Sequence, residues 1–192
     1  MPSHSSEKSI AILEATLSVI AQGGVDAVRY RDVAREAKVP LGTVSYNFPN
    51  RTDLIHAAFR LFLEQSSAVL AATRARLPSE TLEEVAELLA SFARAYLADR
   101  GRCVAEYELM VCAARDPDLH QALTTWDRAR QSELAILLER LDVPRPNNAA
   151  QTLMDMIRGF QLTAIGQERP DFDGLQKRLR DLIHALAGSP AF

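Results

Sequence analysis

The stretch from Arg31 to Phe48, RDVAREAKVPLGTVSYNF, constrains the fold more than any other part of the chain. Two short segments with helical spacing flank the turn KVP. The second segment has few apolar side chains to bury, and Val44 and Phe48 are its inward candidates. Two short helices of this kind, joined by a turn, are typical of a helix-turn-helix. The alternative is an ordinary helical hairpin with a solvated polar face.

The remaining segments also carry helical spacing of apolar residues, so we expect an all-α protein of about nine helices. Two glycines at 23 and 24 end the first helix, and Pro40 suits the first position of the third. Asn50 is the expected cap of a long fourth helix, and Ser79 or Thr81 the cap of the fifth.

The order of the expected helices along the chain indicates two domains. Residues 1–49 form a three-helix N-terminal domain with the helix-turn-helix, and residues 50–192 form a second helical domain. The helix over 50–76 has a wide apolar face, which favours contact with two neighbours, so we expect it to connect the domains. The amino terminus does not predict a signal peptide, and no apolar run reaches the ~18–20 residues that span a bilayer. We therefore expect a cytoplasmic protein with no membrane partner.

The charge balance gives little support to long-range attraction of DNA. The chain has 22 Lys and Arg against 25 Asp and Glu, a net charge of −3. The first 48 residues carry five basic and five acidic side chains, so this segment is neutral. Any DNA binding must therefore depend on where charges and hydrogen-bond donors are placed.

The second short helix has the side chains for such placement. Thr43, Ser45, Tyr46 and Asn47 carry short or planar hydrogen-bonding groups that can meet phosphates and base edges. Such a helix, exposed on most of its faces, can enter the major groove. Arg51 stands at the start of the next helix, where free backbone N–H groups and the helix dipole favour a phosphate.

The first helix, its GG stop, the stretch RDVAREAKVPLGTVSYNFPNRTDLI and the long helix after it resemble the DNA-binding domain of the TetR family of bacterial transcriptional regulators. The match covers roughly residues 7–60, and order, spacing and the Y-x-F-x-x-[KR] ending all agree. The remaining six expected helices are similar to the family's ligand-binding and dimerisation domain in length and helix count only.

The resemblance implies DNA contacts for eight residues. Bases would be contacted by Leu41, Gly42 and Thr43, and a base edge or a phosphate by Arg31. Ser45 and Tyr46 would contact bases or the DNA backbone, and Asn47 and Arg51 would hold phosphates. This sequence departs from the family pattern in the turn. Lys38 stands in place of the usual glycine, so we expect a non-glycine residue in a left-handed conformation. Pro40 stands in place of a usual capping serine.

The resemblance also implies a homodimer that binds a palindromic operator with two recognition helices. The last two helices are the expected interface, because the eighth has apolar residues on two sides and Gly159 and Gly166 permit a close approach. The expected interface residues are Leu153, Ile157, Phe160, Leu175, Leu179 and Leu182. The alternative is that both apolar sides face the subunit's own core.

The resemblance further implies a pocket for a small-molecule effector among the fifth to eighth helices. Large, adaptable side chains suit its walls: Phe92, Tyr96, Tyr107, Met110, Trp126 and Met154. For each of them plain core packing is the alternative. Arg130 follows Trp126 by four residues, so it either binds an anionic ligand, stacks on the indole, or lies solvated at the edge of the apolar stripe.

No pattern in the sequence predicts an enzyme, a cofactor or a metal site. The four histidines are scattered, and there is no nucleophile–base pair or phosphate loop. We expect a ligand-responsive repressor whose partners are double-stranded DNA, a second copy of the chain and a small molecule that releases the DNA. The alternatives are an all-helical small-molecule-binding protein and a protein-interaction module, each without a DNA role.

Overall fold

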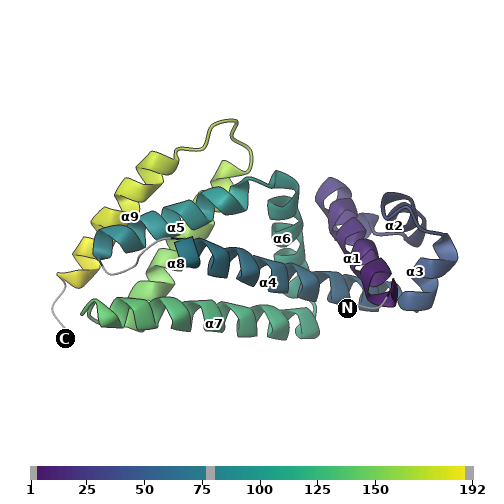
Figure 1. Ribbon diagram of the computed structural model, residues 1–192, viewed down its shortest axis with the longest axis horizontal. Coiled ribbons are helices and arrows are strands. Elements are labelled where there is room, and N and C mark those ends of the chain that lie inside the picture. Colours follow the sequence, from purple (N-terminus) through teal and green to yellow (C-terminus); the bar gives the residue numbers. More distant parts are fainter. Residues whose placement is uncertain (1–3, 77–80, 189–192) are drawn as a thin grey trace. The chain divides into compact units, whose positions relative to one another are not determined.

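The computed structural model describes residues 4–76 and 81–188, and these residues are helical throughout apart from turns (Figure 1). The expected all-α fold is confirmed. The described residues form nine α-helices and one short 3-10 helix: α1 His4–Gly23, η1 Val25–Ala27, α2 Tyr30–Glu36, α3 Leu41–Asn47, α4 Arg51–Arg76, α5 Leu82–Leu97, α6 Arg100–Ala113, α7 Pro117–Arg140, α8 Pro146–Ala164 and α9 Phe172–Ala187.

The described chain packs as two compact units. One contains residues 4–66 and 100–124, and the other contains residues 67–76, 81–99 and 125–188. Helices α4 and α7 therefore contribute to both units. The first part of α4 and the whole of α6 pack with the N-terminal helices. The expected domain boundary after residue 49 stays a prediction.

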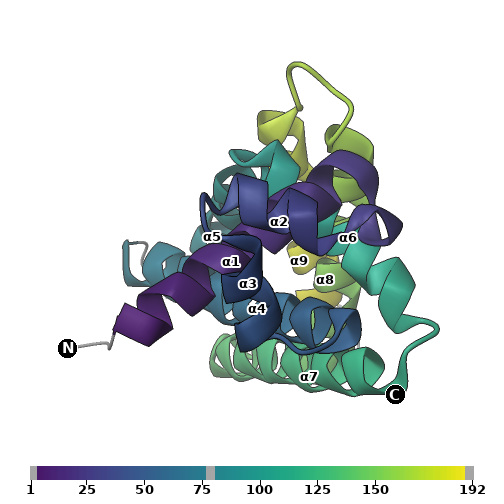
Figure 2. The ribbon, with the colours of Figure 1, turned by 90° about the vertical axis from the view of Figure 1, so that its right-hand side faces the viewer.

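The N-terminal unit has its core between α1, the helix-turn-helix, α4 and α6. Fully buried side chains come from four separate segments, and hydrophobic burial of each contributes about 1.5–3 kcal/mol to folding. They include Ile12, Ile20, Val33, Val44, Leu54, Phe59, Phe62 and Leu109. Helix α1 packs against both α2 and α6 (Figure 2). This core positions α2 and α3.

The second unit has its core between α5, α7, α8 and α9. Helix α5 packs closely along α9, and both contact α8 (Figure 1). The buried cluster takes its side chains from all four helices, among them Val85, Leu89, Leu138, Leu153, Leu175, Leu179 and Ile183. No described helix is long and apolar enough to cross a membrane.

Local signals in the sequence account for several helix ends. Asn50 Oδ1 accepts a hydrogen bond from the Asp53 N–H at 2.8 Å, which confirms the expected cap of α4. Thr81 and Glu84 form a reciprocal capping box at the start of α5. The other expected cap, Ser79, lies outside the described residues. Pro40 is the residue before α3 and not its first residue.

Candidate DNA-binding surface and ligand pocket

Helices α2 and α3 form a helix-turn-helix held by a small buried set of side chains. Val33 and Val44 are fully buried, and Ala34 is 6% exposed. The Val39 N–H donates to the Ala34 carbonyl at 3.0 Å across the turn. Lys38 has φ of 54°, so the expected left-handed non-glycine residue is confirmed.

The outward face of α3 is open to solvent. Tyr46 is 87% exposed and Leu41 45% exposed, although both are large apolar or aromatic side chains. Gly42 and Ser45 are exposed beside them, and a Cβ on Gly42 would meet nothing within 4 Å. Packing among the described residues therefore does not account for the large side chains on this face.

Tyr30 holds the end of α3 in place, a role the sequence did not predict. Its hydroxyl donates to the Phe48 carbonyl oxygen at 2.5 Å, from the first residue of α2. Burial raises the pKa of the Tyr30 hydroxyl, and the charge of Asp53 raises it further. The phenol therefore stays protonated as a donor, and the ring links the two helices.

Asn47 and Arg51, expected to hold phosphates, both make bonds within the unit. Asn47 Nδ2 donates to the Thr43 carbonyl at 2.7 Å, and its Oδ1 accepts from Ser9 Oγ at 3.0 Å. Arg51 donates from Nε to the Val28 carbonyl at 3.0 Å and from Nη2 to the Val25 carbonyl at 2.5 Å. The bond from Ser9 ties α1 to α3, and the bonds from Arg51 tie α4 to η1 and the residue after it. Local sequence patterns did not predict these contacts.

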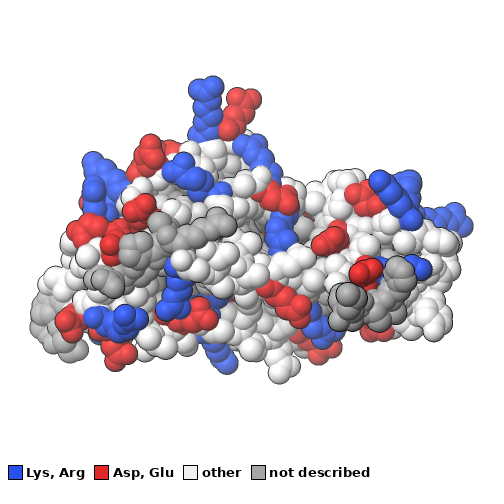
Figure 3. Space-filling model, in the orientation of Figure 1, with Lys and Arg blue, Asp and Glu red and all other residues white. Residues whose placement is uncertain are grey.

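Basic side chains surround the helix-turn-helix. Arg29, Arg31, Arg35 and Lys38 are exposed on α2 and its flanks, and Arg35 pairs with Asp32 at 2.8 Å. Figure 3 shows blue side chains at its right-hand end, where Figure 1 places α2 and α3. The neutral N-terminal segment thus carries four exposed cations on α2, before it and in the turn that leads to α3.

The second unit contains a small cavity of about 50 Å³. Its walls come from the end of α4 and from α5, α7 and α8: Leu70, Arg74, Leu88, Leu89, Phe92, Arg130, Glu133, Leu134, Leu137, Met154 and Ile157. At ~10–15 Å³ for each water, the cavity has room for about four waters. A larger ligand would have to displace flexible walls such as Met154.

Two of the six expected pocket residues, Phe92 and Met154, line this cavity. Tyr96 is buried and does not line the cavity, and its ring centroid lies 5.9 Å from that of Phe92. Trp126 is also buried, and its Nε1 donates to Ser67 Oγ at 3.0 Å. Tyr107 and Met110 lie on α6 in the other unit and do not line the cavity. A sequence pattern could not separate them, because helices of both units have apolar faces.

Arg130 lies over aromatic rings, as expected for stacking on the indole and not for a solvated side chain. Its guanidinium carbon lies 4.3 Å from the centroid of the Trp126 ring and 5.2 Å from that of Phe92. The expectation of a solvated arginine at the edge of the stripe is wrong, since the side chain is half-buried in the cavity wall. Binding of an anion by Arg130 stays open.

Four of the six expected dimer residues are buried in the subunit's own core, which corrects their assignment to an interface, whereas the assignment of the partly exposed Phe160 and Leu182 stays a prediction. Leu153, Ile157, Leu175 and Leu179 are at most 3% exposed, and Phe160 and Leu182 pack against the same cluster. The outward face of α8 carries other residues, Thr152, Asp155, Gly159 and Leu162, and Gly166 follows just after the end of the helix. Leu162 is 57% exposed, and added Cβ atoms at the two glycines would meet nothing within 4 Å.

One group of possible metal ligands occurs among the described residues: His56, Asp116 and Asp118, whose ligand atoms lie within 4.8 Å of one another. His56 Nε2 is 2.7 Å from Asp116 Oδ2, while Asp116 Oδ1 accepts from the N–H groups of Asp118 and Leu119. The hydrogen bond from His56 lowers the pKa of Asp116. Asp116 thus caps α7 and joins it to α4, which explains the arrangement without a metal.

Comparison with known families agrees with this geometry. Residues 12–58 match the model described as bacterial regulatory proteins, tetR family. Residues 80–189, more than half of the chain, match the model described as tetracyclin repressor-like, C-terminal domain. The chain belongs to the TetR family. The resemblance of residues 7–60 to this family is confirmed, and the chain is a ligand-responsive, DNA-binding transcriptional regulator.

Individual proteins are also similar to this chain in sequence or in structure. The transcriptional regulator CymR of Pseudomonas putida is 29% identical over 163 residues, covering 82% of this chain and 79% of CymR. The transcriptional repressor KstR of Mycolicibacterium smegmatis is 37% identical over 62 residues, which span 32% of this chain and 30% of KstR. The crystal structure of the multidrug binding protein EbrR complexed with ethidium has 30% identity and a TM-score of 0.67, covering 91% and 98% of the two chains.

Proposed function

We propose that this regulator is a repressor that binds a near-palindromic DNA operator as a homodimer and releases it when a small molecule occupies the second unit. The observation that carries this proposal is the open face of α3. Tyr46 is 87% exposed on a helix whose opposite face is anchored by fully buried Val44. An exposed aromatic on a short, firmly anchored helix fits a surface that enters the major groove.

The DNA contacts combine a readout face with cations beside it. Leu41, Gly42, Thr43, Ser45 and Tyr46 form the readout face, and the absence of any neighbour around Gly42 permits close approach of a DNA backbone. Arg31 reaches phosphate or a base edge from the start of α2. Asn47 holds the readout helix to α1 through its bond with Ser9, and Arg51 holds the start of α4 to η1. A phosphate contact by either side chain would share the same polar groups.

Dimerisation is proposed through the outward face of α8. Leu162 supplies an exposed apolar side chain, and Gly159 and Gly166 leave room for a second helix to approach. An isologous pair places two copies of α3 in a two-fold arrangement, which matches a palindromic site. As a regulator of bacterial transcription, the protein acts in the cytoplasm.

Release by a small molecule requires that the ligand bind the DNA-incompetent state more tightly than the DNA-bound state. The cavity among α4, α5, α7 and α8 is the proposed site. Two features support a ligand there: largely apolar walls and charged side chains among them. EbrR, of the same fold, has been crystallised with the small molecule ethidium, which supports a small-molecule ligand for this chain as well.

The experiment that tests the proposal is selection of bound duplexes from a random pool by the purified protein at moderate salt. Recovery of a near-palindromic site would support a dimeric regulator, and its half-site spacing would give the distance between recognition helices. The Tyr46→Ala variant, assayed on the recovered site, should bind more weakly with its helical content unchanged. Failure to recover any sequence, also after unfolding and refolding to remove a bound ligand, would contradict the proposal.

A further inference from the structure

We propose that the cavity of the second unit takes a small amphipathic anion, with an apolar body and one carboxylate. This inference rests on the proposed function, because it names the ligand class for the site proposed there. Four observations support it: the apolar walls, their net charge, the stacking of Arg130 and a buried amide without a partner.

The walls set the apolar part of the ligand. Eight of the eleven lining residues are Leu, Ile, Met or Phe, and the other three are Arg74, Arg130 and Glu133. Polar atoms placed against such walls without hydrogen-bond partners would lose hydration and gain nothing in return. The body of the ligand is therefore hydrocarbon, and its polar atoms must meet the three charged residues or a donor close to them.

The charges of the wall select the sign of the ligand. Two arginines and one glutamate leave one positive charge. Arg74 and Glu133 are exposed, whereas Arg130 is half-buried. Water screens the charges at the exposed positions, so the charge of Arg130 acts more strongly on a bound molecule. An anion is favoured there and a cation is disfavoured.

The stacking of Arg130 strengthens this selection. Aromatic faces are the groups that attract organic cations in an apolar site. Here the Arg130 guanidinium already covers the faces of Trp126, at 4.3 Å, and Phe92, at 5.2 Å. The guanidinium keeps its positive charge when it lies over the rings, and the fork geometry of its N–H groups matches a carboxylate.

Gln161 supplies an independent indication of a hydrogen-bond acceptor. It is 5% exposed, and its Nε2 has no hydrogen-bond partner among the described residues. On α8 it follows Ile157 by four residues and Met154 by seven, so the three share a helix face, and the latter two line the cavity. A buried donor without a partner is unfavourable. A ligand carboxylate near this face would relieve it.

The test uses three probes with one hydrocarbon body and different charges: cyclohexanecarboxylate, cyclohexanecarboxamide and cyclohexylmethylamine, at pH 7. None absorbs where tryptophan does, and the chain has one tryptophan, Trp126, against which Arg130 stacks. Titration of the full chain, followed by Trp126 fluorescence and by calorimetry, should give the lowest Kd for the anion and the highest for the cation.

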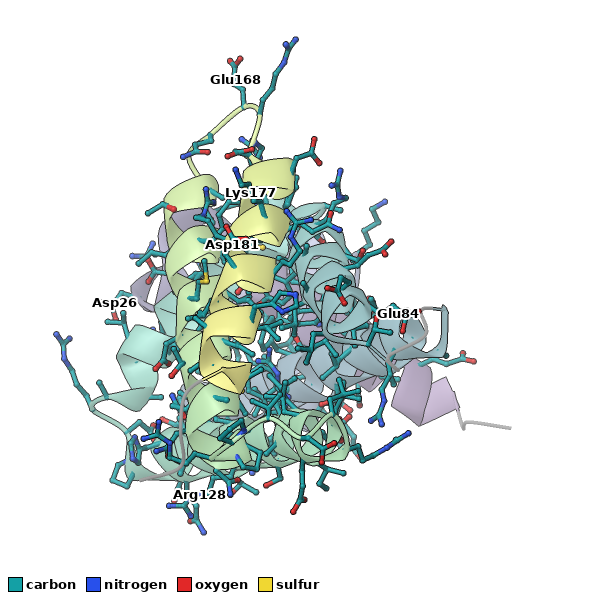
Figure 4. The ribbon with its side chains drawn as sticks, turned by 90° about the vertical axis from the view of Figure 1, so that its left-hand side faces the viewer. Asp26, Glu84, Arg128, Glu168, Lys177 and Asp181 are labelled. Carbon is teal, nitrogen blue, oxygen red and sulfur yellow. The ribbon has the colours of Figure 1, made fainter. Side chains whose placement is uncertain are left out.

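Two variants assign the selectivity to Arg130. Arg130→Gln should weaken binding of the carboxylate about tenfold or more and remove the preference over the amide, because it deletes a charge-assisted hydrogen bond. Arg128→Gln is the matched control, since Arg128 is exposed on the same helix and projects away from the helices in Figure 4. Circular dichroism checks that both variants fold. Equal binding of all three probes, tighter binding of the cation, or an unchanged Kd in Arg130→Gln would overturn the inference.

Failure of this inference differs from failure of the proposed function. If the protein binds its selected duplex and no probe shows the anion preference, the ligand class is wrong and the regulator role stands. If the carboxylate binds through Arg130 but leaves the duplex bound, the ligand class stands and release by this site is wrong.

Discussion

The Nε of Arg51 donates to the Val28 carbonyl oxygen at 3.0 Å, and so joins the first residue of α4 to the segment that leads into α2. A second bond from Nη2 reaches the Val25 carbonyl, while Asp26 lies 3.8 Å from the same group. One guanidinium thus connects two segments of the N-terminal unit that are more than twenty residues apart in the chain.

This bonding predicts that Arg51→Ala destabilises the protein by about 1–3 kcal/mol, because two carbonyl oxygens lose a charged donor. Urea unfolding followed by circular dichroism measures the change. Arg51→Lys keeps the charge but not the fork, so it should recover only part of the loss. A variant that binds DNA more weakly with unchanged stability would instead indicate a pure phosphate ligand.

Tyr46→Ala should leave stability within ~0.5 kcal/mol of the parent protein, since the side chain is 87% exposed. Affinity for the selected operator should fall about fivefold or more, which corresponds to roughly 1 kcal/mol of lost contact. Fluorescence anisotropy at fixed salt measures it. Ile136→Ala, an exposed apolar residue on α7, is the control and should bind DNA as the parent does.

Lys38→Gly should stabilise the protein by up to about 1 kcal/mol, because a left-handed conformation strains a residue with a Cβ. Lys38→Ala should give no gain, since it keeps the Cβ. Denaturant midpoints of the two variants provide the comparison. If both variants were equally stable, the φ of 54° at this turn would carry no measurable strain.

Acid should weaken the link between His56 and Asp116. The His56 hydrogen bond lowers the pKa of Asp116 below its ordinary value of 3.8, so this carboxylate favours the folded state above pH ~4. Its contribution is lost as the pH falls through the lowered pKa, where the folded form must take up a proton. Urea unfolding at a series of pH values between 3 and 6 should show that the free energy of unfolding falls more steeply with acid in the parent than in Asp116→Asn. Parallel curves would show that Asp116 is not a source of the acid sensitivity.

Gly159→Arg tests the proposed dimer face. A side chain at this position meets nothing within the subunit, so the variant should fold normally. It should sediment as a monomer at concentrations where the parent sediments as a dimer, because a long charged side chain prevents close approach of a second α8. Gly159→Ala is the control, since a methyl group permits the approach and alanine favours the helix by about 1 kcal/mol. A dimeric Gly159→Arg protein would place the interface elsewhere.

The sequence by itself determined the helical class, the helix-turn-helix and the family. These follow from local patterns: apolar spacing, the glycines after α1, the Asn50 cap and the order of residues from Arg31 to Phe48. The left-handed Lys38 followed from the resemblance to the family, in which a glycine usually stands at this position of the turn. Each of these features depends on neighbours within a few residues, and such neighbours can be read along the chain.

Only the tertiary structure decided which neighbour each apolar or charged face meets. Periodicity shows that α8 and α9 have apolar faces, but not whether a second subunit or the subunit's own α5 covers them. Leu153 and Leu179 proved to be core residues for this reason. The carbonyl partners of Arg51 and the ring partners of Arg130 are likewise set by packing, because contacts between distant segments depend on the three-dimensional path of the chain.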